Sequence, residues 1–120
     1  SVGASILVIT DYITVYTKRR NKMSERYNGW SNYETWLVNL EMFDGLDADE
    51  LLSSDDVLED PTQAERDLAL RLENMAEEYI ELEVPSRSGF TYNLAMSFLS
   101  KVDFQEIAEH MVSDYIVNMS

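Results

Sequence analysis

Residues 30–43 read WSNYETWLVNLEMF and carry the clearest helical pattern in the chain. Large apolar side chains recur there at steps of three and four residues, the spacing of one helix face: Tyr33, Trp36, Leu37, Leu40 and Phe43. Ser31 and Glu34 fit a capping box, in which two side chains satisfy free amides of the first turn. Gly45 suits the left-handed conformation that follows a helix end. We therefore predict a helix from about residue 31 to residue 43, packed on other helices through this face.

A longer helix is predicted from Asp60 to about Glu83. Asp60 is a good cap, and Pro61 falls in the first turn, where its missing amide does no harm. Pro85 forbids continuation. The side chains expected to be buried are Leu68, Leu72, Met75, Tyr79 and Leu82. Between the two helices, residues 46–60 predict a short helix or turn around Leu51 and Leu52, followed by an acidic loop.

Two more helices complete the predicted fold. One covers about residues 90–100 and carries Leu94, Phe98 and Leu99. The other starts at Asp103, where Glu106 repeats the capping-box spacing. Its apolar face would be Phe104, Ile107, Ala108, Met111, Val112, Tyr115 and Ile116. The prediction is a mainly α protein, a small single-domain bundle of about four helices.

The first 22 residues differ from the rest. Residues 5–17 are rich in Ile, Val, Thr and Tyr, which favours an extended strand, although a helix stays open. Such a strand could pair within the chain or with a second copy, which would give a homo-oligomer. Met23 resembles a natural protein start, so residues 1–22 are interpreted as an extension that is either non-native or strand-forming. Residues 23–120 are then the acidic helical domain.

Composition excludes several classes of function. The chain has 23 acids against 9 bases, a net charge of -14, so direct binding of nucleic acid through phosphates is not expected. Cysteine is absent and histidine occurs once, which excludes thiolate chemistry and multi-histidine metal sites. The apolar stretch near the N-terminus is far shorter than the about 20 residues of a membrane span. Its basic cluster follows that stretch, unlike in a signal peptide. We expect a cytoplasmic protein without membrane contact or cofactor.

Residues 28–40, NGWSNYETWLVNL, resemble the N-terminal signature of a small uncharacterised family found in bacteriophages, plasmids and bacteria. The C-terminal part of that family tends to read like Leu94 to Ala108 here, continuing into Glu109. The resemblance covers roughly residues 27–112. Where relatives often have a second tryptophan after the signature, this chain has Glu41-Met42-Phe43. The family has no established activity to transfer. The resemblance implies a phage or mobile-element accessory protein that acts inside a bacterial cell.

Aromatic and amide side chains of this segment form the first candidate site. Trp30, Tyr33 and Trp36 could make a recognition patch, since Trp and Tyr anchor interfaces, but a core cluster is the favoured interpretation. Asn32 and Thr35 lie at the helix start, where such side chains cap free amides. Structural capping is favoured for them over contact with a ligand.

The acidic segment from Asp44 to Asp60 is the second candidate, with eight acids and no base. Asp47-Ala48-Asp49 resembles the start of a calcium loop, but the required glycine and the final glutamate are missing. A solvated acidic surface is favoured over a metal site. The acids considered are Asp47, Asp49, Glu50, Asp55, Asp56 and Glu59. The pair of Glu106 or Glu109 with His110 could move protons, but a structural role is favoured.

The function expected from these patterns is that of a non-enzymatic accessory protein working by contact with an unknown protein partner. The alternative is an acidic decoy that imitates DNA phosphates and inhibits a host DNA-binding or defence protein. A small metal-dependent enzyme is the least favoured hypothesis.

Overall fold

The computed structural model describes residues 10, 12–15, 18 and 27–119. The helices are α2 (Tyr33–Val38), η1 (Asn39–Phe43), α3 (Ala48–Leu51), α4 (Ser54–Glu59), α5 (Pro61–Glu83), α6 (Phe90–Leu99) and α7 (Phe104–Met119). The described part of the chain contains no β-strand, only an isolated bridge between Tyr27 and Trp30. The predicted mainly α single domain is confirmed. No helix in the described ranges has both the length and the apolarity to cross a bilayer.

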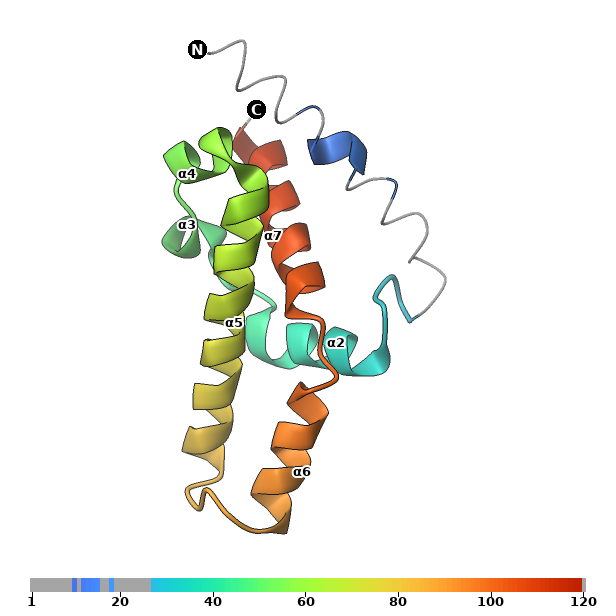
Figure 1. Cartoon of the computed structure of the whole chain (residues 1–120), viewed down its shortest axis with the longest axis vertical. Helices are drawn as coiled ribbons and strands as arrows, with labels where there is room; N and C mark the ends of the chain where they lie inside the picture. Colours follow the sequence, from blue (N-terminus) through green and yellow to red (C-terminus); the bar gives the residue numbers. More distant parts are fainter. Residues whose placement is uncertain (1–9, 11, 16–17, 19–26, 120) are drawn as a thin grey trace.

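The centre of the fold is the packing of α5 against α7. Figure 1 shows the two helices side by side, with α6 continuing below α7 and α2 crossing at the level where α6 gives way to α7. Leu72 and Ala76 of α5 and Ile107 and Ala108 of α7 have no exposed surface at all. The small alanine side chains let the two backbones approach closely, since interaxial distance depends on the side chains at the contact.

Local start and stop signals were predicted well. The Asp60 carboxylate accepts from the Gln63 amide at 3.1 Å, and α5 ends at Glu83 as expected. Asp103 caps α7 by accepting from the Glu106 amide at 3.0 Å. Gly45 has a positive φ of 86°, the left-handed conformation expected there. These signals depend only on neighbours in sequence, which is why the sequence reveals them.

The buried faces were predicted less well. In α5 the buried positions advance by four residues, through Leu68, Leu72, Ala76 and Ile80. The expected continuation through Met75, Tyr79 and Leu82 is wrong for Tyr79 and Leu82, which are 45% and 83% exposed. The reason is that α7 contacts one narrow stripe of α5, and the predicted stripe turns away from it.

The first helix ends in a π-helical turn, η1, that the pattern did not predict. The Asp44 amide donates to the Asn39 carbonyl at 2.7 Å, across five residues. Because of this wider turn, Phe43 joins the core next to Val38, which precedes it by five residues. Leu40, in contrast, is 45% exposed. The expected burial of Leu40 is therefore wrong. A π-turn is rare and often occurs at functional sites.

The acidic segment is more helical than predicted. Its second part forms α4, with Ser53 as cap and Val57 completely buried, where an acidic loop was expected. All eight of its carboxylate-bearing residues, from Asp44 to Asp60, are exposed. The helix forms because Ser53 caps it and Val57 gives it one apolar anchor.

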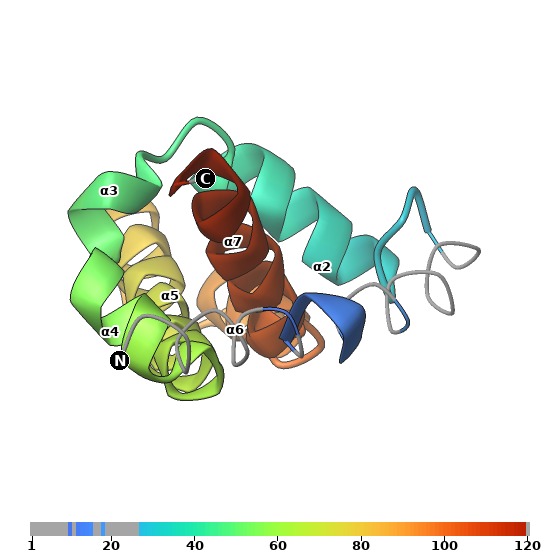
Figure 2. The ribbon, with the colours of Figure 1, turned by 90° about the horizontal axis from the view of Figure 1, so that it is seen from above.

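The strand expected within residues 5–17 is wrong for the described residues, because Thr10 and Tyr12–Val15 are helical. The Thr14 hydroxyl donates to the Thr10 carbonyl at 3.0 Å, a helical spacing. Tyr12 is buried, and its hydroxyl donates to the Glu109 carbonyl of α7 at 3.4 Å. Figure 2 shows this short helical piece beside α7. The remaining residues of 5–17 lie outside the described ranges, and assembly through this segment stays a prediction.

Candidate functional site

A polar junction joins the segment before α2 to the start of α7. The Ser31 amide and hydroxyl both donate to Glu106 Oε1, at 3.0 and 2.8 Å. Glu106 is only 2% exposed, so its carboxylate is an internal partner. Both capping boxes predicted from sequence are therefore wrong in part. Ser31 does not cap the first helix, and Glu106 turns towards Ser31.

Asn32 takes the capping role that was expected of Ser31. Its Oδ1 accepts from the Thr35 amide at 2.8 Å, and its Nδ2 donates to the Lys101 carbonyl at 2.8 Å. Thr35 is completely buried, and its hydroxyl accepts from the Asp103 amide at 2.9 Å. We call these contacts the polar junction: Ser31, Asn32 and Thr35 with Lys101, Asp103 and Glu106. It joins the segment before and within the first turn of α2 to the segment from the end of α6 to the first turn of α7.

The aromatic residues of the signature divide into two groups. Tyr33 and Trp36 pack with Tyr27, with ring centroids 5.2 to 5.7 Å apart. Trp30 instead stacks on His110, at 4.0 Å and 17° between ring planes. Trp30 is buried, whereas Tyr33 is 43% exposed. The three side chains therefore do not form one patch.

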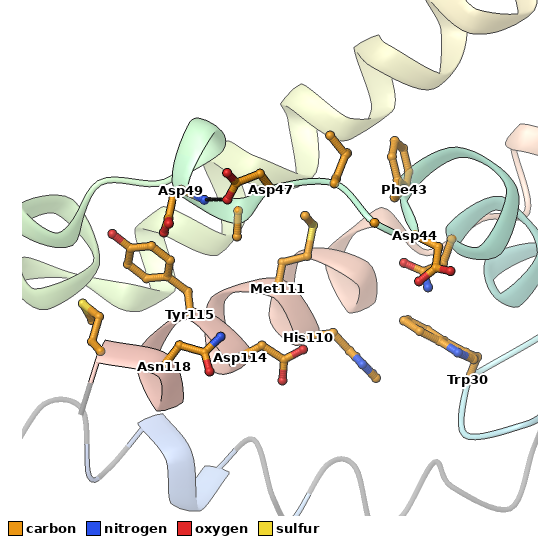
Figure 3. Close-up of a pocket in the computed structure, with 15 residues that line it drawn as sticks. Trp30, Phe43, Asp44, Asp47, Asp49, His110, Met111, Asp114, Tyr115 and Asn118 are labelled. Atoms are coloured by element: carbon orange, nitrogen blue, oxygen red, sulfur yellow. Dashed lines mark hydrogen bonds between the residues drawn. The ribbon is translucent and has the colours of Figure 1, made fainter.

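The Trp30–His110 stack forms one end of a groove of about 650 Å³ (Figure 3). We call this hollow the acidic groove. Asp44, Asp47 and Asp49 line one wall, and α7 supplies Asp114, with further lining from Met111, Tyr115 and Asn118. The Asp47 carboxylate also accepts from the Asp49 amide at 2.9 Å, capping α3. Partial burial raises the pKa of Asp114, because desolvation disfavours its charged form. The groove is suited to attracting positive charge.

The acidic groove gathers Trp30, Asp47 and Asp49 from the candidates chosen by sequence. The other acids lie apart, exposed on α3 and α4: Glu50, Asp55, Asp56 and Glu59. Across the described ranges, no group of three or more His, Cys, Asp or Glu side chains is arranged to hold a metal ion. Sequence reasoning missed Asp114. Its position four residues after His110, on the same helix face, was the available signal.

A second hollow, of about 660 Å³, lies between α2–η1, the end of α5 and α6. We call it the α6 groove. Its lining is mainly apolar and includes Leu37, Met42, Ile80, Leu94 and Phe98. Leu94 is 59% exposed.

Apolar side chains remain exposed next to the α6 groove as well. Phe90, one turn before Leu94 on α6, is 80% exposed, and Tyr79 of α5, which lines the groove, is 45% exposed. The sequence offered a signal for this surface, since Phe90 and Leu94 are four residues apart. However, the same spacing also describes a helix face buried in a core.

Comparison with known proteins identifies the chain by family alone. No curated protein and no solved structure matches it. Residues 23–119 match the model of DUF7249, described as a family of unknown function. The match includes both sides of the polar junction and all three helical walls of the α6 groove. The chain therefore belongs to the DUF7249 family.

Proposed function

We propose that this protein is a non-enzymatic interaction module that binds a protein partner through the α6 groove. The observation that carries the proposal is the exposure of several large apolar side chains around one hollow. Leu94 and Tyr79 line it, and Phe90 lies one turn before Leu94 on α6. Exposed apolar patches rimmed by polar residues mark protein–protein interaction sites.

Burial of these side chains would supply the binding energy. Aromatic and aliphatic anchors at the centre of an interface contribute most of its affinity. Phe90 and Leu94 lie four residues apart on α6, so one partner surface can cover both. The polar rim would set orientation more than affinity.

The cellular setting belongs to the same proposal. The likeness of residues 28–40 to proteins of phages, plasmids and bacteria supports an accessory role in a mobile element, in the cytoplasm of a bacterial or phage-infected cell. The partner would then be a bacterial or phage protein.

The test compares two variants of matched exposure. Leu94→Gln removes an apolar group from the groove, whereas Leu70→Gln changes a side chain that is 64% exposed on α5 and outside the groove. Proteins captured from a bacterial lysate are quantified for both variants and the wild type. The proposal predicts that a captured partner is retained by Leu70→Gln and weakened about tenfold by Leu94→Gln. Equal capture by both variants would contradict it.

A second candidate function is the acidic decoy. It is favoured by the segment from Asp44 to Asp60, whose eight acids are all exposed on or beside α3 and α4. A decoy would occupy the basic groove of a DNA-binding protein through long-range attraction. Its affinity would fall steeply between low and high salt, because exposed charges are screened. A partner held mainly by the apolar lining of the α6 groove would lose much less affinity, so a salt series of the same capture separates the two functions.

A further inference from the structure

The walls of the α6 groove are helical on every side. The C-terminal part of α5 and the length of α6 flank it, and α2–η1 closes one end (Figure 1). The described residues offer no strand edge to which a partner strand could add. Recognition by strand addition therefore lacks a template here. A helix laid between α5 and α6 is the element that fits such a hollow, since helix side chains interdigitate in ridges and grooves.

The C-terminal part of α5 that flanks the groove is acidic, because residues 73–83 carry five acids and no base. Glu41 lies in its wall and is exposed. Helical spacing places further acids three or four residues from lining positions of α2 and α5: Glu34, Glu77 and Glu83. Lys101 is the lining residue with a positive charge. An occupant with flanking positive charge is attracted to this border, and one with negative charge is repelled.

We propose that the occupant of the α6 groove is an amphipathic helix of a partner protein, apolar on one face and flanked by lysine or arginine. This inference rests on the proposed function and adds the chemical class of the partner. The apolar face covers Leu94 and its neighbours, and the basic flanks lie against Glu41 and the acids beside it. Helices of this kind enter hydrophobic grooves through residues spaced by three and four.

A second copy of the chain is a poorer occupant. The whole chain carries a net charge of -14, so two copies repel each other at moderate salt. In a two-fold contact between copies, α6 of one copy would lie against the groove of the other, and its exposed face brings no basic flank. Its sequence, FTYNLAMSFL, contains neither lysine nor arginine.

The probe that tests the inference is a short designed peptide of leucine and lysine with helical amphipathic spacing, labelled for fluorescence anisotropy. Two further peptides serve as controls: a leucine–glutamate peptide of the same pattern, and a leucine–lysine peptide of the same composition in shuffled order. The inference predicts that the amphipathic leucine–lysine peptide binds at least about tenfold more tightly than either control.

Matched protein variants locate the binding. Leu94→Gln should weaken the leucine–lysine peptide about tenfold, while Leu70→Gln leaves it unchanged. Glu41→Gln should weaken it a few-fold at low salt, while Glu73→Gln, an exposed α5 acid outside the groove, has a smaller effect. None of these variants removes a buried side chain, and circular dichroism checks that each one remains folded.

Three results would overturn the inference. The first is equal binding of all three peptides, and the second is binding insensitive to Leu94→Gln. The third is a dimer in sedimentation that Leu94→Gln dissociates, because that result assigns the groove to a second copy. If peptide binding fails while partner capture still depends on Leu94, the helical partner is wrong and the proposed function stands. If partner capture is independent of Leu94, the proposed function itself fails.

Discussion

The polar junction and the α6 groove lie in one small domain but differ in chemical character: the first is polar and buried, and the second is apolar and exposed. In the polar junction, buried groups such as Thr35 and Glu106 meet hydrogen-bond partners far away in sequence. In the α6 groove, large apolar side chains such as Leu94 remain open to water. The polar groups of the junction therefore find their partners inside the fold, whereas the apolar side chains of the groove remain available to a partner protein.

The difference shows that a distinctive sequence motif does not by itself mark a functional site. Ser31 and Asn32, which lie in the distinctive stretch of residues 28–40, tie α2 to the corner between α6 and α7. Fixed polar pairs of this kind need particular residue types, so they produce a recognisable motif. An apolar docking surface accepts many combinations of side chains and leaves a weak pattern.

The largest effect is expected from Glu106→Ala. This change removes the acceptor of both the Ser31 amide and the Ser31 hydroxyl and leaves two part-buried donors without this partner. We expect a loss of roughly 3 kcal/mol in the free energy of unfolding, measured in urea. Glu73→Ala, at an exposed position of α5, is the control and should change stability by less than about 0.5 kcal/mol. Similar losses in both variants would mean that the junction contributes little.

A smaller loss is expected from Thr35→Val. Valine keeps the shape of the completely buried side chain but leaves the Asp103 amide without the hydroxyl that accepts from it at 2.9 Å. The expected loss is about 1 to 2 kcal/mol, seen as a lower urea midpoint with an unchanged slope. Thr35→Ser retains the hydroxyl that accepts from the Asp103 amide, so its urea midpoint should lie closer to that of the wild type. A stable Thr35→Val protein would show that packing alone holds this corner.

The Asn32 cap should be worth about 1 kcal/mol. Asn32→Ala removes the acceptor of the Thr35 amide and the donor to the Lys101 carbonyl. Asp60→Ala, which removes only the local cap of α5, is the comparison. Thermal unfolding should show Asn32→Ala to be at least as destabilising as Asp60→Ala. The reverse order would indicate that the contact with Lys101 adds nothing.

Asp114→Asn should have a small effect that depends on pH. Since burial raises the pKa of this carboxyl in the folded state, the folded protein binds the proton more readily than the unfolded chain. At every pH above the folded pKa, the charged carboxylate therefore lowers the free energy of unfolding by a small amount. This penalty disappears as the pH falls below the folded pKa. Asp114→Asn should be marginally more stable than wild type near pH 7 and lose this advantage in acid. Unfolding curves over a pH series would reveal an opposite trend if the sign is wrong.

The smallest effect on stability is expected where the effect on binding is largest. Leu94→Gln changes a side chain that is 59% exposed, so the free energy of unfolding should shift by less than about 0.5 kcal/mol. Leu70→Gln should behave in the same way. A strongly destabilised Leu94→Gln protein would mean that α6 depends on this residue for its fold, which would contradict the division into a structural region and an open one.

The sequence predicted the elements of the fold better than their faces. The cap at Asp60 and the end of α5 at Glu83 follow from local chemistry, and both are present. The burial of Leu40 and Leu82 was predicted wrongly, because apolar spacing shows that a helix has a face but not whether another helix covers it. The π-turn of η1 contributes to the error at Leu40, because it makes the buried positions advance by five residues, from Val38 to Phe43.

The candidate site was predicted only in fragments. Trp30, Asp47 and Asp49 do share one groove, yet the acids of α4 lie elsewhere. Ser31 and Glu106 each fit a local capping pattern, and their long-range pairing is not encoded in any spacing along the chain. The α6 groove depends on three helices that leave a face uncovered, which only the assembled fold shows.

The most direct test of the central claim is a map of backbone amide shifts in NMR spectra as the leucine–lysine peptide is added. The account predicts that shifts concentrate on residues lining the α6 groove, such as Leu37, Ile80 and Leu94, while amides of the polar junction keep their positions. Shifts concentrated instead on the acidic groove, at Trp30, Asp47 and Asp114, would contradict it.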